Sequence, residues 1–410
     1  MDRFQSLGFP STGDEEWRFT SVAPIAETSF MLATDGRTAL GSADLSPFRL
    51  TDFARAEIAF VNGRYAAELS KIHELPGGVR VESLAAALAN HAGDIDPYLT
   101  RFAGFERQAF TALNTAFLAD GAFLYVPAAT IVDSPIHVLF VSTACSAPLA
   151  STMAHPRVLV VMGGSSQATI VESYVGPQGH RYLTNAVTEI VLGDNAVVDH
   201  YKLQRESVHG YHIGTMHVAG SRSATFRSHS ISFGGSVVRN EVVAVLDGEG
   251  IDCTLDGLYV ADERRLVDNH TTIDHAKPHC GSREVYKGIL AGHARAVFNG
   301  KIIVRPDAQK TDAKQTNKAL LLSEDAQINT TPQLEIFAND VKCTHGAAVG
   351  QMDDEALFYL RARGLSHQEA QNLLIHAFAA DVLNSMPLEP LRTRVEAVLL
   401  RQLARAVPTA

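Results

Sequence analysis

The sequence predicts a mainly β protein with a parallel β-helix at its core and helical regions at both ends. The first observation is that more than 200 residues after residue 121 contain no convincing helix. They consist of short apolar and β-branched runs separated by Gly, Asp and Ser turns, as in "RVLVVMGGSSQATIVESYVG". Apolar residues make up 46% of the chain and charged residues 20%, as is ordinary for a globular protein.

The second observation is that the turns repeat. Segments such as "GGSSQATIV", "GDNAVVDHY" and "GSRSATFRS" begin with a turn cluster and continue into alternating small and apolar residues. Alignment on Ala168, Ala196, Ala224, Ile251, Ala294 and Ala326 gives steps of 28, 28, 27, 43 and 32 residues. A period near 28 with one larger insertion is typical of a solenoid whose coils each hold several strands of about five residues. The alternative is a β-sandwich with evenly spaced hairpins.

Three regions follow from this pattern. Residues 1–120 are expected to be helical or mixed, residues 121–350 to form the β-helix, and residues 351–410 to be helical again. In the last region Gly364 has the position of a helix C′ residue, and Ser366 and Glu369 have the spacing of a capping box. The following helix carries an apolar stripe that includes Leu373, Leu374 and Phe378. This stripe either packs on the β core or docks a partner.

Charge and motifs exclude several classes of function. A net charge of −10 argues against nucleic acid or an anionic membrane surface as a partner. The chain has no apolar run of about 18 residues and its start does not read as a secretory signal, so we expect a cytoplasmic protein. No P-loop motif is present, so the chain is not expected to hydrolyse ATP through such a loop.

The stretch from His270 to Cys280 is a first candidate site. It contains His270, Asp274, His275, His279 and Cys280, all of them possible metal ligands. A metal-dependent β-helix enzyme would use such a set. The alternatives are a polar ladder between coils, since strand residues alternate between faces, and a contact with another subunit.

The segment "VKCTHGAAVG" is a second candidate. Cys343 and His345 are two residues apart, so on a strand both side chains point to the same face. A thiolate and an imidazole together can hold iron or zinc, but a closed tetrahedral site needs about four ligands. The pair is therefore at most half of a site, and a buried inert cysteine beside a hydrogen-bonded histidine remains the alternative.

The chain resembles the SufB/SufD family of iron–sulfur cluster assembly proteins. The resemblance rests on "DNHTTIDHAKPHCGSREVYKGIL", "ARAVFNGKIIV", the segment from "AQKTDAKQTNKALLL" to "VKCTHGAAVG", "FYLRARG" and the N-terminal "EEWRFTSV". The length of the chain, and a first cysteine as late as Cys145, are similar to SufD rather than SufB.

The resemblance implies a right-handed β-helix that acts as a non-catalytic scaffold. It implies two partners, a SufB-like homologue that pairs through the β-helix and the SufC ATPase, which hydrolyses ATP. SufC would dock on the C-terminal helices, for which the candidate residues are Phe358, Leu373, Leu374 and Phe378. His345, with Cys343 beside it, would be a ligand for a transient iron–sulfur cluster or iron shared with SufB. The isolated chain is then expected to hold no tightly bound cofactor and to form a homodimer when SufB is missing.

Overall fold

The computed structural model describes residues 1–33, 42–143 and 151–406, and within them two 11-stranded sheets form a parallel β-solenoid. The sheet that ends in β21 contains β1 (Phe30–Leu32), β5 (Arg80–Ser83), β6 (Gly121–Val126), β8 (Ser151–Ala154), β9 (Arg157–Met162), β11 (Tyr182–Leu192), β13 (Tyr211–Gly220), β15 (Val237–Leu246), β17 (Leu266–His275), β19 (Arg295–Val304) and β21 (Gln327–Ile336). The sheet that ends in β22 contains β2 (Ala56–Val61), β3 (Arg64–Tyr65), β4 (Lys71–Ile72), β7 (Ile136–Val141), β10 (Gln167–Val175), β12 (Val197–Arg205), β14 (Thr225–Ser232), β16 (Asp252–Ala261), β18 (Gly281–Leu290), β20 (Asp312–Leu321) and β22 (Lys342–Gln351).

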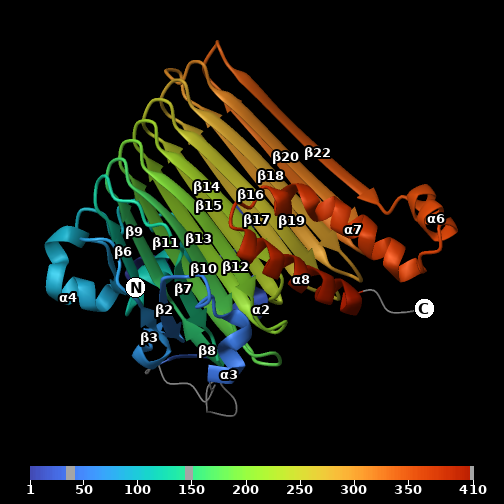
Figure 1. Ribbon diagram of the computed structural model, residues 1–410, viewed down its shortest axis with the longest axis horizontal. Coiled ribbons are helices and arrows are strands. Elements are labelled where there is room, and N and C mark those ends of the chain that lie inside the picture. The colour runs from blue at the N-terminus through green and yellow to red at the C-terminus, as the bar shows by residue number, and fades with distance from the viewer. Residues whose placement is uncertain (34–41, 144–150, 407–410) are drawn as a thin grey trace.

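The pairing confirms the predicted solenoid and excludes the sandwich. From β11 to β22, each strand pairs in parallel with the strand two places earlier, and consecutive strands alternate between the sheets. A sandwich built from hairpins would instead pair consecutive strands in antiparallel fashion. Figure 1 shows the result as a stack of tilted coils whose colour changes steadily from green to orange.

The coil itself differs from the prediction in two respects. From β10 on, each coil has two strands of 8–11 residues rather than several of about five. The apparent insertion is also wrong, because the register places Val197 beside Thr225, Thr225 beside Asp252 and Gly281 beside Asp312, and from β10 to β22 all paired strands are offset by 26–32 residues. The 43-residue step arose because Ile251 precedes a strand of the β22 sheet, whereas Ala294 precedes a strand of the β21 sheet.

A left-handed backbone position explains why the turns look alike. In successive coils the residue two places before the β22-sheet strand has positive φ; these residues are Ser165, Asn195, Ser223, Gly250, His279 and Lys310. Such a conformation turns the chain sharply and costs little for Gly, Asn or small polar residues. The same backbone conformation therefore occurs in each of these turns, although the residue at this position differs from coil to coil.

The chain also forms eight α-helices within the described residues, most of which cover the outer faces of the two sheets. They are α1 (Asp2–Leu7), α2 (Ala23–Ala26), α3 (Ser42–Leu45), α4 (Leu84–Ile95), α5 (Ala109–Ala116), α6 (Asp354–Ala362), α7 (His367–Asn384) and α8 (Glu389–Ala406). α2 and α5 bury Ile25 and Phe110 on the β21 sheet, against Ile213. α7 and α8 lie along the β22 sheet (Figure 1), where Ile375 and Leu399 join Ile231 in one apolar cluster.

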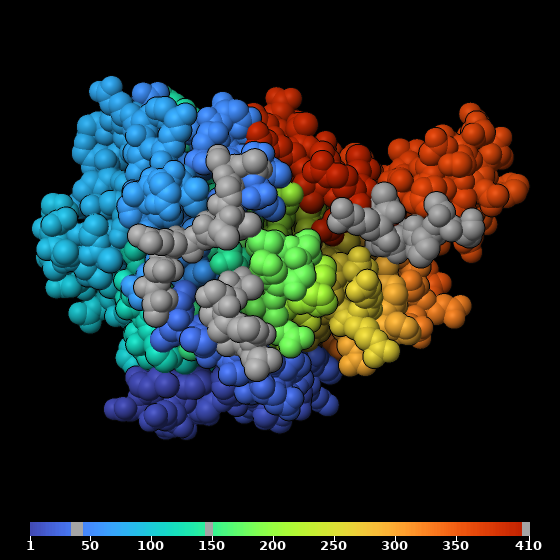
Figure 2. Space-filling model, turned by 90° about the horizontal axis from the view of Figure 1, so that it is seen from below, coloured from blue at the N-terminus to red at the C-terminus, as the bar shows by residue number. Residues whose placement is uncertain are grey.

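The N-terminal region also supplies strands. β2 pairs in parallel with β7, and β5 pairs with β6 in antiparallel fashion, so both sheets begin before residue 121. Figure 2 shows these N-terminal residues in blue at one end of the molecule and the last coils in yellow and orange at the other. The two ends of the solenoid thus have different structures.

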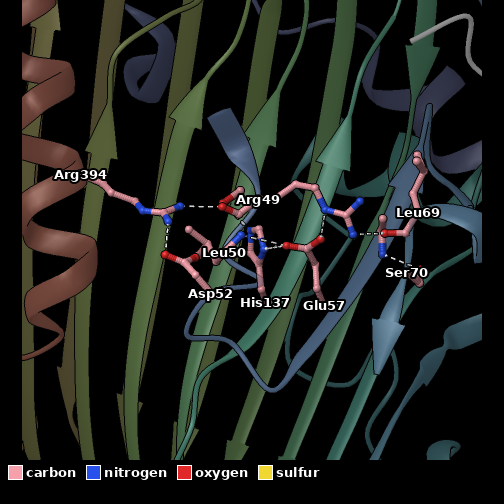
Figure 3. Close-up of polar contacts among 10 residues, drawn as sticks. Arg49, Leu50, Asp52, Glu57, Leu69, Ser70, His137 and Arg394 are labelled. Atoms are coloured by element: carbon pink, nitrogen blue, oxygen red, sulfur yellow. Dashed lines mark hydrogen bonds and ion pairs between the residues drawn. The ribbon is translucent and has the colours of Figure 1, made fainter. Parts of the chain in front are cut away.

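A buried carboxylate joins the N-terminal region to the first coils. Glu57 on β2 is fully buried and accepts hydrogen bonds from Arg49 Nε (2.6 Å), His137 Nδ1 (2.8 Å) and the Leu50 backbone N–H (3.0 Å). Arg394 of α8 reaches the same segment, donating to the Arg49 carbonyl and pairing with Asp52 (Figure 3). Burial acts to raise the pKa of Glu57, but its donors offset this and hold the pKa below its usual value.

We expect Glu57→Ala to destabilise the chain by about 3 kcal/mol or more, because it leaves the buried His137 and Arg49 without their acceptor. The free energy of unfolding from urea titration measures this loss. The control is Glu68→Ala, an exposed glutamate nearby, which should change the value by less than about 0.5 kcal/mol. Equal stability of the two variants would show that the Glu57 contacts do not hold this region.

Candidate functional site

The predicted pair Cys343 and His345 lies on β22, the last strand of the solenoid. Cys343 is in register with Ala313 and His345 with Gln315 on β20. Both β20 residues are buried and point to the solenoid interior, so Cys343 and His345 share that inward-facing side of the sheet. In the part of the chain that the structure describes, no strand pairs with the outer edge of β22.

The two side chains differ in their surroundings. Cys343 is half-buried and packs beside Ile302, Ala308 and Leu334 in a small apolar cluster under the last coil. Burial raises the pKa of its thiol, so the thiol is protonated at neutral pH in the isolated chain. His345 is exposed to solvent. The imidazole is therefore the more accessible ligand of the two.

The structure provides these two candidate ligands without others nearby. Across residues 1–33, 42–143 and 151–406, no group of three or more His, Cys, Asp or Glu side chains is arranged to hold a metal ion. Cys145 lies outside these ranges. A site with about four ligands at this place would need residues from a second chain.

The stretch from His270 to Cys280 is not one site. His270 and Asp274 lie on the outer face of β17, where His270 contacts Asp268 and Asp274 pairs with Arg305. His275 is on the opposite, inward face and bonds Ser282 at 2.9 Å, and the buried Cys280 thiol donates to the Gly248 carbonyl. Each of these groups has its own structural partner. The structure therefore does not support a metal-dependent enzyme that uses this stretch.

The candidate docking residues divide into two sets. Phe358 on α6 is 74% exposed and Leu373 on α7 is 49% exposed. Leu374 is half-buried, and Phe378 is packed under α7 against the β22 sheet. There Lys287 of β18 donates to the Phe378 carbonyl at 2.6 Å and lies 4.9 Å from its ring. Phe378 therefore fixes α7 to the solenoid, and Phe358 and Leu373 remain on the surface.

α6 stands apart from the solenoid. None of its residues is buried, and Tyr359 beside Phe358 is also 57% exposed. Figure 1 shows α6 at the end of the molecule, beyond the strands. Asp353 caps its N-terminus, accepting hydrogen bonds from the N–H groups of Glu355 and Ala356, which stabilises the first turn of this exposed helix.

Two polar side chains pair with each other in the interior of the last coils. Glu284 on β18 and Gln315 on β20 are register neighbours, are 1% and 2% exposed, and both point inward. Gln315 Nε2 donates to Glu284 Oε2 at 2.8 Å. Burial raises the pKa of Glu284 to about 7. The sequence gives no sign of this pairing, because it depends on the length of one particular coil.

The comparisons with known proteins agree with this architecture. Residues 143–378 match the SufBD core domain of the SUF system of iron–sulfur cluster assembly, and residues 1–138 match the SufBD N-terminal region. An iron–sulfur cluster assembly SufBD family protein of Synechocystis is 35% identical over 96% of this chain and 87% of its own length. The iron–sulfur cluster assembly protein SufD of Escherichia coli is 30% identical over 96% of this chain and 89% of its own. SufD of Bacillus subtilis is 28% identical over 82% of this chain and 77% of its own.

A parallel β-solenoid with helices at both ends, matched by both domains, places the chain in the SufBD family of iron–sulfur cluster assembly proteins. Within that family the chain is SufD-like. Among the described residues, no helix is both long and apolar enough to cross a membrane.

Glu284 is expected to make stability depend on pH. Its folded-state pKa of about 7 lies above the usual 4.5, so the folded chain keeps a proton that the unfolded chain releases. The contribution of Glu284 to the free energy of unfolding therefore falls as pH rises from about 4.5 to about 7, by about 3 kcal/mol in total. Glu284→Gln removes this loss.

Urea unfolding of the wild type and Glu284→Gln at pH 5 and pH 8 tests this expectation. The difference in free energy of unfolding between Glu284→Gln and the wild type should be more favourable to the variant at pH 8 than at pH 5. The same difference for Glu324→Gln, at an exposed position, should not change with pH. A constant difference between wild type and Glu284→Gln over this pH range would contradict the raised pKa.

Proposed function

We propose that the chain is a non-catalytic scaffold subunit that works with a SufB-like homologue and the SufC ATPase in cluster assembly. In this proposal His345, with Cys343 beside it, is a ligand for a nascent iron–sulfur cluster or for iron at the junction with the homologue. The observation that carries the proposal is the exposed His345 on the final strand of the solenoid, whose outer edge pairs with no other strand among the described residues. A ligand in this place is open to a second chain.

The number of ligands supports a shared site. One imidazole and one protonated, half-buried thiol cannot by themselves close a site that needs about four ligands. The cluster is then cargo that both chains hold for a time, and the isolated chain holds no cofactor tightly. A metal that withdraws the thiol proton would let Cys343 join as a thiolate.

The features of the last coil favour a partner that is itself a solenoid. β22 offers a row of unpaired backbone N–H and C=O groups along its outer edge, and Ile336, Phe337 and Val349 beside it are 40%, 62% and 48% exposed. A SufB-like chain could continue the sheet and cover this apolar surface. Without that chain, a second copy could take its place as a homodimer.

The exposed α6 supports the docking of SufC. Phe358 and Leu373 are exposed apolar side chains, and the exposed Tyr359 contacts Arg363 at the end of α6. This part of the chain lies at the far end of the molecule from the N-terminal region (Figure 2). ATP hydrolysis belongs to SufC in this proposal. The complex is expected to work in the cytoplasm.

We expect His345→Ala to lower cluster assembly. The variant would be expressed with its SufB-like and SufC partners and reconstituted anaerobically, and bound iron and sulfide would be measured. The affinity for iron should fall by at least about tenfold, because even residues that only support a ligand change metal affinity 10–100-fold.

The control for this experiment is His293→Ala, which changes an exposed histidine in a turn whose ring pairs with the exposed Asp325. It should assemble clusters as the wild type does. Wild-type iron and sulfide in the His345→Ala complex would refute the proposed ligand role.

We expect Phe358→Asp to weaken SufC binding by about 30-fold, the loss of about 2 kcal/mol typical of a buried aromatic anchor. Folding should not change, because α6 buries none of its residues in this chain. Titration calorimetry with SufC measures the change. Ile131→Asp, at an exposed position near the start of the solenoid, is the control, and equal affinities of the two variants would refute α6 as the docking surface.

A further inference from the structure

An inward-facing row of polar side chains leads to His345. Glu284, Gln315 and His345 follow one another in register on β18, β20 and β22, on the side of the sheet that faces the solenoid interior. The first two are almost completely buried, and His345 forms the exposed end of the row. The candidate ligand is thus the register neighbour of a buried amide.

The amide of Gln315 has a fixed orientation. Its Nε2 donates to Glu284 Oε2 at 2.8 Å, so its oxygen cannot face that carboxylate. Across the interior, a Cβ on Gly300 would lie 2.3 Å from Gln315 Nε2, so any larger residue at position 300 would displace the amide. Glu284 on one side and Gly300 on the other therefore hold the Gln315 side chain in place.

The oxygen of this amide has no partner. Gln315 Oε1 is buried and accepts no hydrogen bond within the chain. Buried acceptors are nearly always paired, because an unpaired one costs free energy. The side chain beside it in register is His345, on a strand about 4.8 Å away, and a histidine ring always carries at least one N–H donor.

The neighbouring amide does not serve the same purpose. Asn317 also has a buried, unpaired oxygen, and its Nδ2 donates to Thr330 Oγ1 at 2.8 Å. Its register partner on β22 is Ala347, which offers no side-chain donor. Only the Gln315 oxygen is placed beside the histidine.

We propose that Gln315 is a positioning residue for His345: its Oε1 accepts the N–H of one ring nitrogen and leaves the other nitrogen for iron or a cluster. Such a bond fixes the tautomer and the orientation of the ring, as carbonyl and carboxylate groups do for most histidine ligands of metals. The consequence for cluster assembly rests on the proposed function, whereas the hydrogen bond itself does not.

The hydrogen bond can be tested without metal. The full chain would be labelled with ¹⁵N-histidine, and the signals of His345 would be identified by their loss in His345→Ala. In the wild type we expect one neutral tautomer to predominate, seen in long-range ¹H–¹⁵N correlation spectra. Gln315→Met, which keeps the length but removes the oxygen, should shift the tautomer ratio of His345, and Asn317→Leu on the same strand should not.

An exchange of two residues tests for rescue. In Glu284→Gln with Gln315→Glu, the new amide can donate to the new carboxylate, whose second oxygen can accept the His345 N–H. This double variant should restore the wild-type tautomer. Should Gln315→Met not fold, Gln315→Asn withdraws the amide by one methylene and should shift the tautomer in the same direction. An unchanged tautomer in whichever of these variants folds would overturn the proposal.

Iron binding separates this inference from the proposed function. Ferrous iron would be titrated into the complex with the SufB-like and SufC partners, and Gln315→Met should weaken binding about 10–100-fold. If His345→Ala weakens binding but Gln315→Met changes neither binding nor tautomer, the positioning role is wrong and the ligand role stands. If the tautomer responds to Gln315→Met but His345→Ala binds iron normally, the hydrogen bond stands and the ligand role is wrong.

Discussion

The fold depends on parallel pairing between coils that lie one turn apart. Each strand from β9 to β20 satisfies its backbone N–H and C=O groups with the coil before it and the coil after it. At the last coil this pairing is incomplete, because among the described residues β22 has a neighbouring strand on one side only and the backbone groups along its other edge have no strand to pair with. The exposed strand, the accessible His345 and the apolar residues beside it all follow from this one constraint.

The same constraint gives the interior its polar content. Residues at equivalent positions of successive coils lie about 4.8 Å apart, so a polar group on one coil can bond the group above it. Glu284 and Gln315 do this in the last coils, and His200 and Ser228 do so nearer the N-terminus, with Nδ1 of His200 2.9 Å from Oγ of Ser228. A solenoid can therefore bury charged side chains, because the neighbouring coil offers each of them a hydrogen-bond partner at a regular distance. A core assembled from distant segments has no such regular spacing.

Local rules in the sequence were sufficient for part of this description. Side chains two residues apart on a strand lie on the same face, so the sequence alone placed Cys343 and His345 on one face. The repeated turns predicted the solenoid. The relation between coils was harder to predict, because coils of 26–32 residues differ enough in length to hide which residues are neighbours. The pairing of Gln315 with Glu284 and His345 depends on those lengths. Likewise, the apolar residues of α7 gave no indication of which would be buried, and Phe378 is packed against Lys287 while Leu373 is exposed.

The two ends of the solenoid also determine how far association can proceed. At the N-terminal end, β2 carries the short antiparallel strands β3 and β4, and β5 runs antiparallel to β6, so neither sheet offers a long parallel edge there. At the other end, β22 is open along ten residues. If two copies of the chain pair through β22, the two ends that remain exposed are the N-terminal ends, which have no long parallel edge. Growth then stops at a pair, and a protein built as a stack of identical coils avoids becoming a fibre.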